Sequence, residues 1–138
     1  MYDAFISCWD EKYRSNRIRP ESFINEKIDR NWRPYLQTPP FPEYPSGHSV
    51  ISTAAALVLT KLFGENFSFT DSTEIEFGLT SRSFKSFEEA CDEAAISRMY
   101  GGIHYRPAFE NGLTEGKAVG TYILSKVKTR KEEVAEAQ

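Results

Sequence analysis

Five prolines crowd residues 34–45, and the stretch Ser46–Phe63 that follows them is apolar on almost every side. Proline fixes φ and lacks an amide hydrogen, so the first segment is expected to be a stiff, extended loop. A helix that is apolar all round is stable only when it is surrounded, so Ser46–Phe63 is expected to be the central buried helix of the fold. This stretch is too short, and too rich in hydroxyl side chains, for a membrane span.

Amphipathic patterns predict helices before this central one. A helix over Asp3–Arg14 would place four residues on one face at spacings of i, i+3, i+4 and i+7, namely Phe5, Cys8, Trp9 and Lys12. That helix should end before Pro20, because the residue preceding a proline is pushed out of helical backbone space. A second short helix is expected over Glu21–Asp29.

The second half of the chain carries two more helical patterns. Ser86–Glu89 matches a capping box, and the helix that follows it has Arg98 on its apolar stripe. Gly101-Gly102 should end that helix. A last helix is expected over Leu113–Val127, with glycines that allow a close approach to a neighbouring helix.

The polar and aromatic stretch after the central helix predicts a small hairpin, with strands at Phe67–Phe69 and Ile75–Phe77. Helical signals dominate everywhere else. A chain of 138 residues with 40% apolar side chains can bury one core. We therefore predict an all-α helical bundle that forms one domain over residues 1–127, followed by a charged, solvated tail at 128–138.

Charge and cysteine content narrow the classes of partner. The chain has 17 basic and 20 acidic residues, a net charge of -3, and no run of like charge before the tail. It therefore has neither the signature of a nucleic-acid partner nor a polybasic membrane contact. Cys8 and Cys91 match no disulfide framework or metal motif and are expected to be buried thiols. Two histidines without a cluster of carboxylates or thiolates do not suit zinc.

The N-terminus bears on completeness and location. The first residues lack the basic and apolar regions of a secretory signal. The candidate site begins at Lys12, so we expect this sequence to be the C-terminal part of a longer protein whose earlier helices are absent from it. The compartment cannot be read from such a sequence.

Three cations are candidates for an anion site. Lys12 and Arg98 lie on apolar helix faces, where a charge costs several kcal/mol unless an opposite charge compensates it. Arg19 follows Lys12 by seven residues and would point nearly the same way while the helix persists. Each residue alone has an ordinary explanation, such as a snorkelling lysine, but together they favour a bound anion.

The start of the central helix adds further donors. Ser46-Gly47-His48 precedes or opens this helix, where unpaired N–H groups and the positive end of the dipole favour anions. Ser46 could equally be an ordinary N-cap. His104 could reach the same pocket because Gly101-Gly102 breaks the preceding helix. One of the two histidines would then act as a nucleophile or ligand, and the other would carry protons.

Three spaced motifs carry a family resemblance. Lys12–Pro20 matches K-x6-R-P, Pro45–His48 matches P-S-G-H, and Ser97–His104 matches S-R-x5-H. In this order they resemble the superfamily of type-two phosphatidic-acid phosphatases, bacterial acid phosphatases and vanadium-dependent haloperoxidases. The string T-P-P-F-P-E-Y-P-S-G-H-S at Thr38–Ser49 is most similar to the haloperoxidase branch. The resemblance implies an all-helical fold.

The resemblance also implies roles. The oxygens of phosphate or vanadate would be held by Lys12, Arg19, Ser46, Gly47 and Arg98. His104 would attack phosphorus or ligate vanadium, and His48 would be the proton donor. Vanadate would be the cofactor of a haloperoxidase acting on peroxide and halide, whereas a phosphatase acting on phosphomonoesters would need none. An exported or periplasmic location is compatible with the family.

The sequence departs from the family at one position. An aspartate usually follows the second histidine by four residues and orients its ring, but Ala108 stands there. Glu110 or a backbone carbonyl could replace that carboxylate. The leading hypothesis is a haloperoxidase, the alternative is a phosphatase working through a phosphohistidine at His104, and a third hypothesis is a non-catalytic phosphate-binding domain.

Overall fold

The computed structural model describes residues 1–128, in which five α-helices, a 3-10 turn and a two-stranded hairpin follow one another along the chain. In order they are α1 (Tyr2–Ser15), α2 (Pro20–Lys27), α3 (Gly47–Phe63), β1 (Phe69–Asp71), η1 (Ile75–Phe77), β2 (Arg82–Phe84), α4 (Phe87–Tyr100) and α5 (Arg106–Lys126). The all-α prediction is confirmed. The predicted tail lies almost entirely outside the described residues.

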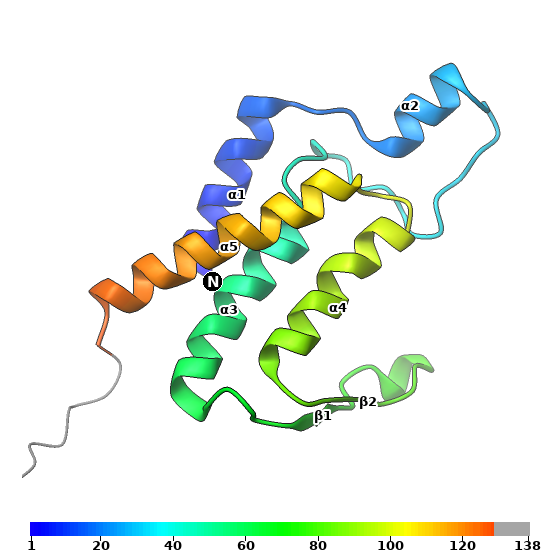
Figure 1. The fold of residues 1–138 in the computed structure, drawn as a ribbon. Coiled ribbons are helices and arrows are strands. Elements are labelled where there is room, and N and C mark those ends of the chain that lie inside the picture. Colours follow the sequence, from blue (N-terminus) through cyan, green and yellow to red (C-terminus); the bar gives the residue numbers. More distant parts are fainter. Residues whose placement is uncertain (129–138) are drawn as a thin grey trace, which may run out of the picture.

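Helix α3 lies at the centre, with α1, α4 and α5 packed around it (Figure 1). Its side chains Val50 and Ala54 are buried and form the core together with Ala4 and Cys8 of α1. An apolar helix is stabilised by neighbours, and this position covers most of its length, while Lys61 and Phe63 at its end are exposed. The prediction of a central buried helix is confirmed.

Helices α3 and α5 approach closely along three glycines. Gly112, Gly116 and Gly120 are spaced by four residues and therefore share one face of α5. A Cβ atom placed on Gly116 would meet the carbonyl oxygen of Val50 and lie 2.7 Å from the Cβ of Thr53. This packing fixes the start of α5 beside the start of α3.

Helix α1 ends at Ser15, before it reaches Arg19. Asn16 caps it in the left-handed region at φ 44°, and its N–H donates to the carbonyl of Lys12. Arg19 therefore lies in the connection, as the N-cap of α2. Helix α2 packs against no other helix or strand within residues 1–128 and extends from the bundle (Figure 1). Lys12 and Arg19 therefore do not share a helix face, because the helix ends between them, close to its predicted end at Arg14.

Helix α5 begins at Arg106 and not near Leu113. Pro107 occupies its first turn, where proline is favoured because its missing N–H would have no partner there. The prediction relied on apolar residues from Val119 onward and left out Ala108 and Phe109, which are buried in the first turn. The earlier start places α5 directly after His104.

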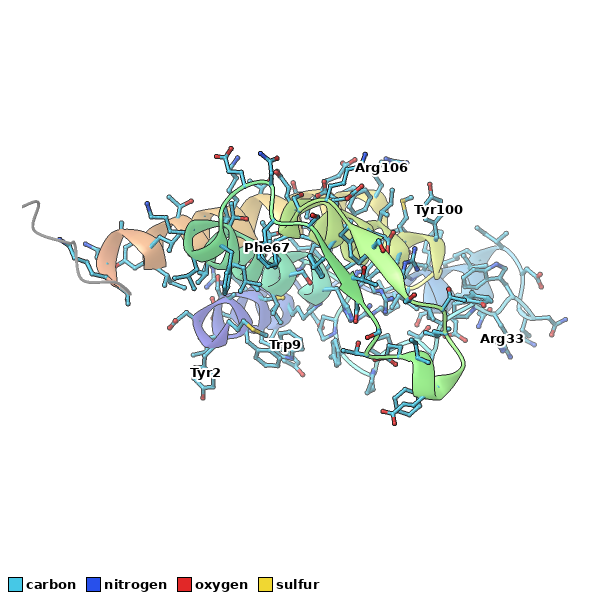
Figure 2. All side chains as sticks on the ribbon, turned by 90° about the horizontal axis from the view of Figure 1, so that it is seen from below. Tyr2, Trp9, Arg33, Phe67, Tyr100 and Arg106 are labelled. Atoms are coloured by element: carbon cyan, nitrogen blue, oxygen red, sulfur yellow. The ribbon has the colours of Figure 1, made fainter. Side chains whose placement is uncertain are left out.

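The hairpin is present, but with a different second strand. Phe69 pairs with Phe84 and Asp71 with Arg82, whereas the predicted strand Ile75–Phe77 is a 3-10 turn that ends at Gly78 with φ 84°. A cluster of aromatic rings joins the hairpin to the end of α3 and the start of α4. It consists of Phe63, Phe67, Phe69 and Phe87. Figure 2 shows Phe67 over this end of the molecule.

Two further expectations concern single residues. Cys8 and Cys91 are free, buried thiols, as predicted. One half of the predicted capping box is present, because the N–H of Glu89 donates to the Oγ of Ser86 at 3.1 Å, whereas the carboxylate of Glu89 accepts from the N–H of Lys85 and not from that of Ser86. Within residues 1–128, no helix has both the length and the apolarity that crossing a membrane would need.

Candidate oxyanion site

The residues singled out in the sequence meet at the end of the bundle opposite the hairpin. There the last turn of α1, the beginnings of α2, α3 and α5, and the end of α4 come together (Figure 1). The proline loop before α3 runs through the middle of this region. It contributes main-chain carbonyls on one side and the side chain of Glu43 on the other.

Lys12 is fully buried beneath the proline loop. Its ammonium group donates to the carbonyls of Pro42 at 3.1 Å and Glu43 at 3.2 Å, and also to the carbonyl of Pro45. An ammonium group has three donors, so these carbonyls use all of them. Burial lowers the pKa of Lys12 to about 8. In this structure carbonyl oxygens surround the ammonium group, and the expectation that its charge compensates a bound anion stays a prediction.

Arg19 is held by the same loop. Its Nε donates to the carbonyl of Phe41 at 3.0 Å, and its Nη2 donates to that of Pro42 at 3.2 Å. Its Nη1 donates to the carbonyl of Ile103 at 2.9 Å and lies 3.1 Å from Nε2 of His104. These four contacts leave one of the five guanidinium N–H groups available for a ligand.

The contacts of His104 fix which ring nitrogen carries its proton. A guanidinium can only donate, so Nε2 of His104 accepts from Arg19 and is unprotonated. The proton is therefore on Nδ1, which donates to Oε1 of Glu43 at 2.9 Å. Burial, and to a lesser extent the charge of Arg19, lowers the pKa of His104, and this favours the neutral ring. The lone pair of Nε2 accepts from Arg19 in this structure, so a ligand at Nε2 would replace that hydrogen bond.

Glu110, the expected substitute for the missing aspartate, is not near His104. Its side chain is 52% exposed and pairs with Arg106 at 3.4 Å. Arg106 itself extends outward on the face away from α1 (Figure 2). Residues 106 and 110 are one helical turn apart, so both follow the outer face of α5.

Sequence reasoning did not single out Glu43, which contacts His104 in the structure. A signal was present, since Glu43 is the only acidic residue between Asp29 and Glu65. A lone carboxylate inside a proline-rich, apolar segment is expected to be paired if it is buried.

The start of α3 offers main-chain donors. Ser46 is fully buried, its Oγ accepts from the N–H of Ser49 at 3.4 Å, and its own N–H donates to the carbonyl of Ala108 at 3.0 Å. The Ser46 hydroxyl hydrogen is left to donate elsewhere. In the described part of the chain, nothing accepts from the N–H groups of Gly47 and His48. A Cβ on Gly47 would lie 3.1 Å from the ring of Trp9, so only glycine fits there without a shift.

Arg98 and His48 form the outer rim. Nε of Arg98 donates to the Oγ of its neighbour Ser97 at 3.0 Å, and no carboxylate of residues 1–128 pairs with its guanidinium. Burial lowers the pKa of Arg98. The side chain of His48 is exposed, yet desolvation and the charges of Arg98 and His104 lower its pKa. A neutral imidazole therefore stands beside a cation at the mouth of the site.

This set of groups fits a tetrahedral oxyanion such as phosphate or vanadate. The candidate site has three cations, Lys12, Arg19 and Arg98, and the carboxylate of Glu43 accepts from His104. Free donors remain on Arg98, Arg19, Ser46, Gly47 and His48, and these are the kinds of donor that hold phosphate at a helix N-terminus. Lys12 contributes its positive charge, since its three N–H donors already bond carbonyl oxygens. Trp9 and Phe41 cover the cations, with the Lys12 Nζ 5.6 Å and 5.5 Å from their ring centres.

Comparisons with known proteins identify the family of this chain. A family model described as the VCPO second helical-bundle domain matches residues 1–133. The structure of the first bacterial vanadium-dependent iodoperoxidase is 67% identical over 91% of this chain, with a TM-score of 0.89. A holo-type bacterial vanadium-dependent chloroperoxidase covers 87% of this chain at 21% identity and a TM-score of 0.73, and this supports the fold.

The chain corresponds to only part of each of these relatives. The chain spans 31% of the iodoperoxidase chain and 32% of the chloroperoxidase chain, about a third of each. No curated protein matches. The motifs, the bundle and the family model all indicate the same relationship. The chain belongs to the vanadium haloperoxidase family, in the part that corresponds to its second helical bundle.

Proposed function

We propose that this chain forms the vanadate-binding part of a haloperoxidase that oxidises a halide with hydrogen peroxide, and that iodide is its first candidate substrate. The observation that supports this most is the unprotonated Nε2 of His104, which faces a set of cationic and main-chain donors. The similarity to a bacterial iodoperoxidase at 67% identity supports the choice of iodide.

The residues of the site have distinct tasks in this proposal. Lys12, Arg19 and Arg98 offset the negative charge of vanadate, and Ser46 with the N–H of Gly47 donates to its oxygens. Nε2 of His104 would hold the vanadium atom. Bound vanadate would supply the centre at which peroxide is activated, so that peroxide, halide and one proton give hypohalous acid and water.

His48 is the proposed proton carrier. Its side chain is exposed, and the lowered pKa keeps the ring neutral at neutral pH, so the ring can accept a proton from peroxide. The ring can then exchange this proton with solvent. Its place at the rim, close to Arg98, lets it exchange with water without opening the buried part of the site.

A phosphatase is the second candidate, and the same lone pair supports it. Nε2 of His104 could attack the phosphorus atom of a phosphomonoester, and His48 could protonate the leaving alcohol. In that reaction the P–O bond to the alcohol breaks as the N–P bond forms, and water then releases phosphate. A non-catalytic phosphate-binding domain is the third candidate.

One set of assays separates these functions. Purified chain is assayed with peroxide and iodide, bromide or chloride, with and without orthovanadate, and separately with a small phosphomonoester. Vanadate-dependent iodide oxidation that His104→Ala removes and Arg106→Ala leaves unchanged is the expected result. Ester hydrolysis without vanadate, removed by the same variant, would favour the phosphatase. Vanadate binding without either activity would favour the non-catalytic domain.

A further inference from the structure

We propose that Glu43 is the positioning residue of His104, and that it replaces from the proline loop the carboxylate that the chain lacks at Ala108. This role rests on the proposed function, because it concerns the histidine that would hold the oxyanion. Its evidence is geometric and lies within the described residues.

The carboxylate of Glu43 is 1% exposed and serves two donors. Its Oε1 accepts from Nδ1 of His104 at 2.9 Å and from the backbone N–H of Tyr105 at 2.9 Å. The two donors belong to consecutive residues, so the ring and its own backbone are tied to one oxygen atom. Rotation of the imidazole would break the first bond while the second still held the carboxylate in place.

Glu43 is itself fixed on both sides. Its N–H donates to the carbonyl of Arg17 at 2.9 Å, and its carbonyl accepts from Nζ of Lys12 at 3.2 Å. Prolines flank it at positions 42 and 45 and restrict the backbone further. A carboxylate on so rigid a segment can hold a ring within the tolerance of about 0.5 Å that a working site needs.

The consequence for His104 is a single tautomer. The Glu43 carboxylate accepts the Nδ1 proton, which leaves the lone pair on Nε2 where Arg19 approaches. A carboxylate partner also raises the basicity of a ligating imidazole. The same loop cages Lys12 and Arg19 through its carbonyls, so one segment sets the positions of three site residues.

A purely structural role is the competing explanation. Tyr105 is the N-cap of α5, and Glu43 could serve only to pair its N–H at the start of that helix. In that case the loss of Glu43 would lower the stability without changing the ring of His104 in the molecules that remain folded. The two explanations therefore differ in a measurement on the imidazole itself.

The test uses three variants of the whole chain: Glu43→Gln, Glu43→Met and, as a matched control, Glu110→Gln. Proton and nitrogen NMR of the His104 ring, without any anion, follow the Nδ1–H signal. In the wild type this signal should be strongly downfield and protected from exchange, because a buried carboxylate accepts it. Calorimetric titration with orthovanadate and with phosphate measures the affinity.

A graded response is expected. The Nδ1–H signal should move upfield in Glu43→Gln, which keeps an acceptor without the charge, and should be lost to exchange in Glu43→Met. Affinity for both anions should fall by about 10- to 100-fold in Glu43→Gln. Glu110→Gln should match the wild type in both measurements.

An unchanged Nδ1–H signal and affinity in folded Glu43→Gln would overturn the role, and so would an equal change in Glu110→Gln. If Glu43→Met does not fold, Glu43→Gln alone decides. The NMR signal needs no bound anion and no activity. Absence of halide oxidation would therefore contradict the proposed function, while the NMR measurement would still test the positioning role of Glu43.

Discussion

Replacing Arg98 with alanine should weaken oxyanion binding while leaving the fold almost unchanged. Its only hydrogen bond to a side chain within residues 1–128 is to its neighbour Ser97, and no carboxylate there pairs with it. The guanidinium therefore contributes little to the folded chain by itself. Its remaining donors are available to a ligand at the rim of the site.

The expected loss of affinity follows from the hydrogen bonds that Arg98 can offer to a ligand. A hydrogen bond to a charged group contributes roughly 1.5–3 kcal/mol, and each 1.4 kcal/mol is about a factor of ten in affinity. One lost contact of this kind therefore weakens binding by about 10- to 150-fold. The free energy of unfolding should change by less than about 1 kcal/mol, as for a substitution outside the core.

Titration calorimetry with orthovanadate and urea unfolding measure the two quantities. The matched control is Arg106→Ala, which removes an exposed arginine from the outer face of α5 and should affect neither. Equal affinity in the wild type and Arg98→Ala would refute the reasoning. So would a loss of affinity in Arg106→Ala of the same size.

Three further outcomes are expected. Because the charged form of Lys12 favours a bound anion and the pKa of Lys12 is about 8, the affinity for orthovanadate should fall above about pH 8, by at most about tenfold per pH unit. Lys12→Arg should flatten this pH profile, and the same slope in the variant and the wild type would contradict the prediction. Gly116→Ala should lower the free energy of unfolding by about 1–3 kcal/mol and Gly120→Ala by less, since a Cβ at the second position meets no atom closer than 3.0 Å; urea titration compares them. Cys8 and Cys91 should react with a thiol reagent only as the chain unfolds, because both are buried and burial raises both pKa values, that of Cys8 to about 11; rapid labelling of native protein would contradict this.

Local patterns predicted the helices well where apolar spacing was dense. Helix α3 begins one residue after its predicted start because Ser46 is the N-cap, and α4 begins at Phe87, directly after the N-cap Ser86 of the predicted capping box. Helix α5 was predicted too short, because the prediction used the apolar residues from Val119 onward and left out Ala108 and Phe109, which are buried in its first turn. The second hairpin strand was misplaced, because cross-strand pairing depends on contacts distant in the sequence.

The convergence of the site residues could be predicted, but their partners could not. Lys12 was expected to face an anion, and in the structure its ammonium group donates to main-chain carbonyls, which no sequence pattern indicated. Carbonyls leave no mark in a sequence, since every residue has one. Glu43 left a mark as an isolated carboxylate, but only the folded chain brings it to His104. The roles of the site residues in catalysis stay predictions.

A crystal structure of the chain with orthovanadate tests the central claim most directly. The expected result is vanadium at coordination distance from Nε2 of His104, with its oxygens receiving hydrogen bonds from Arg98 and from the start of α3. Vanadate bound at another place, or a fully occupied site in which Nδ1 of His104 had turned to the metal, would contradict the claim.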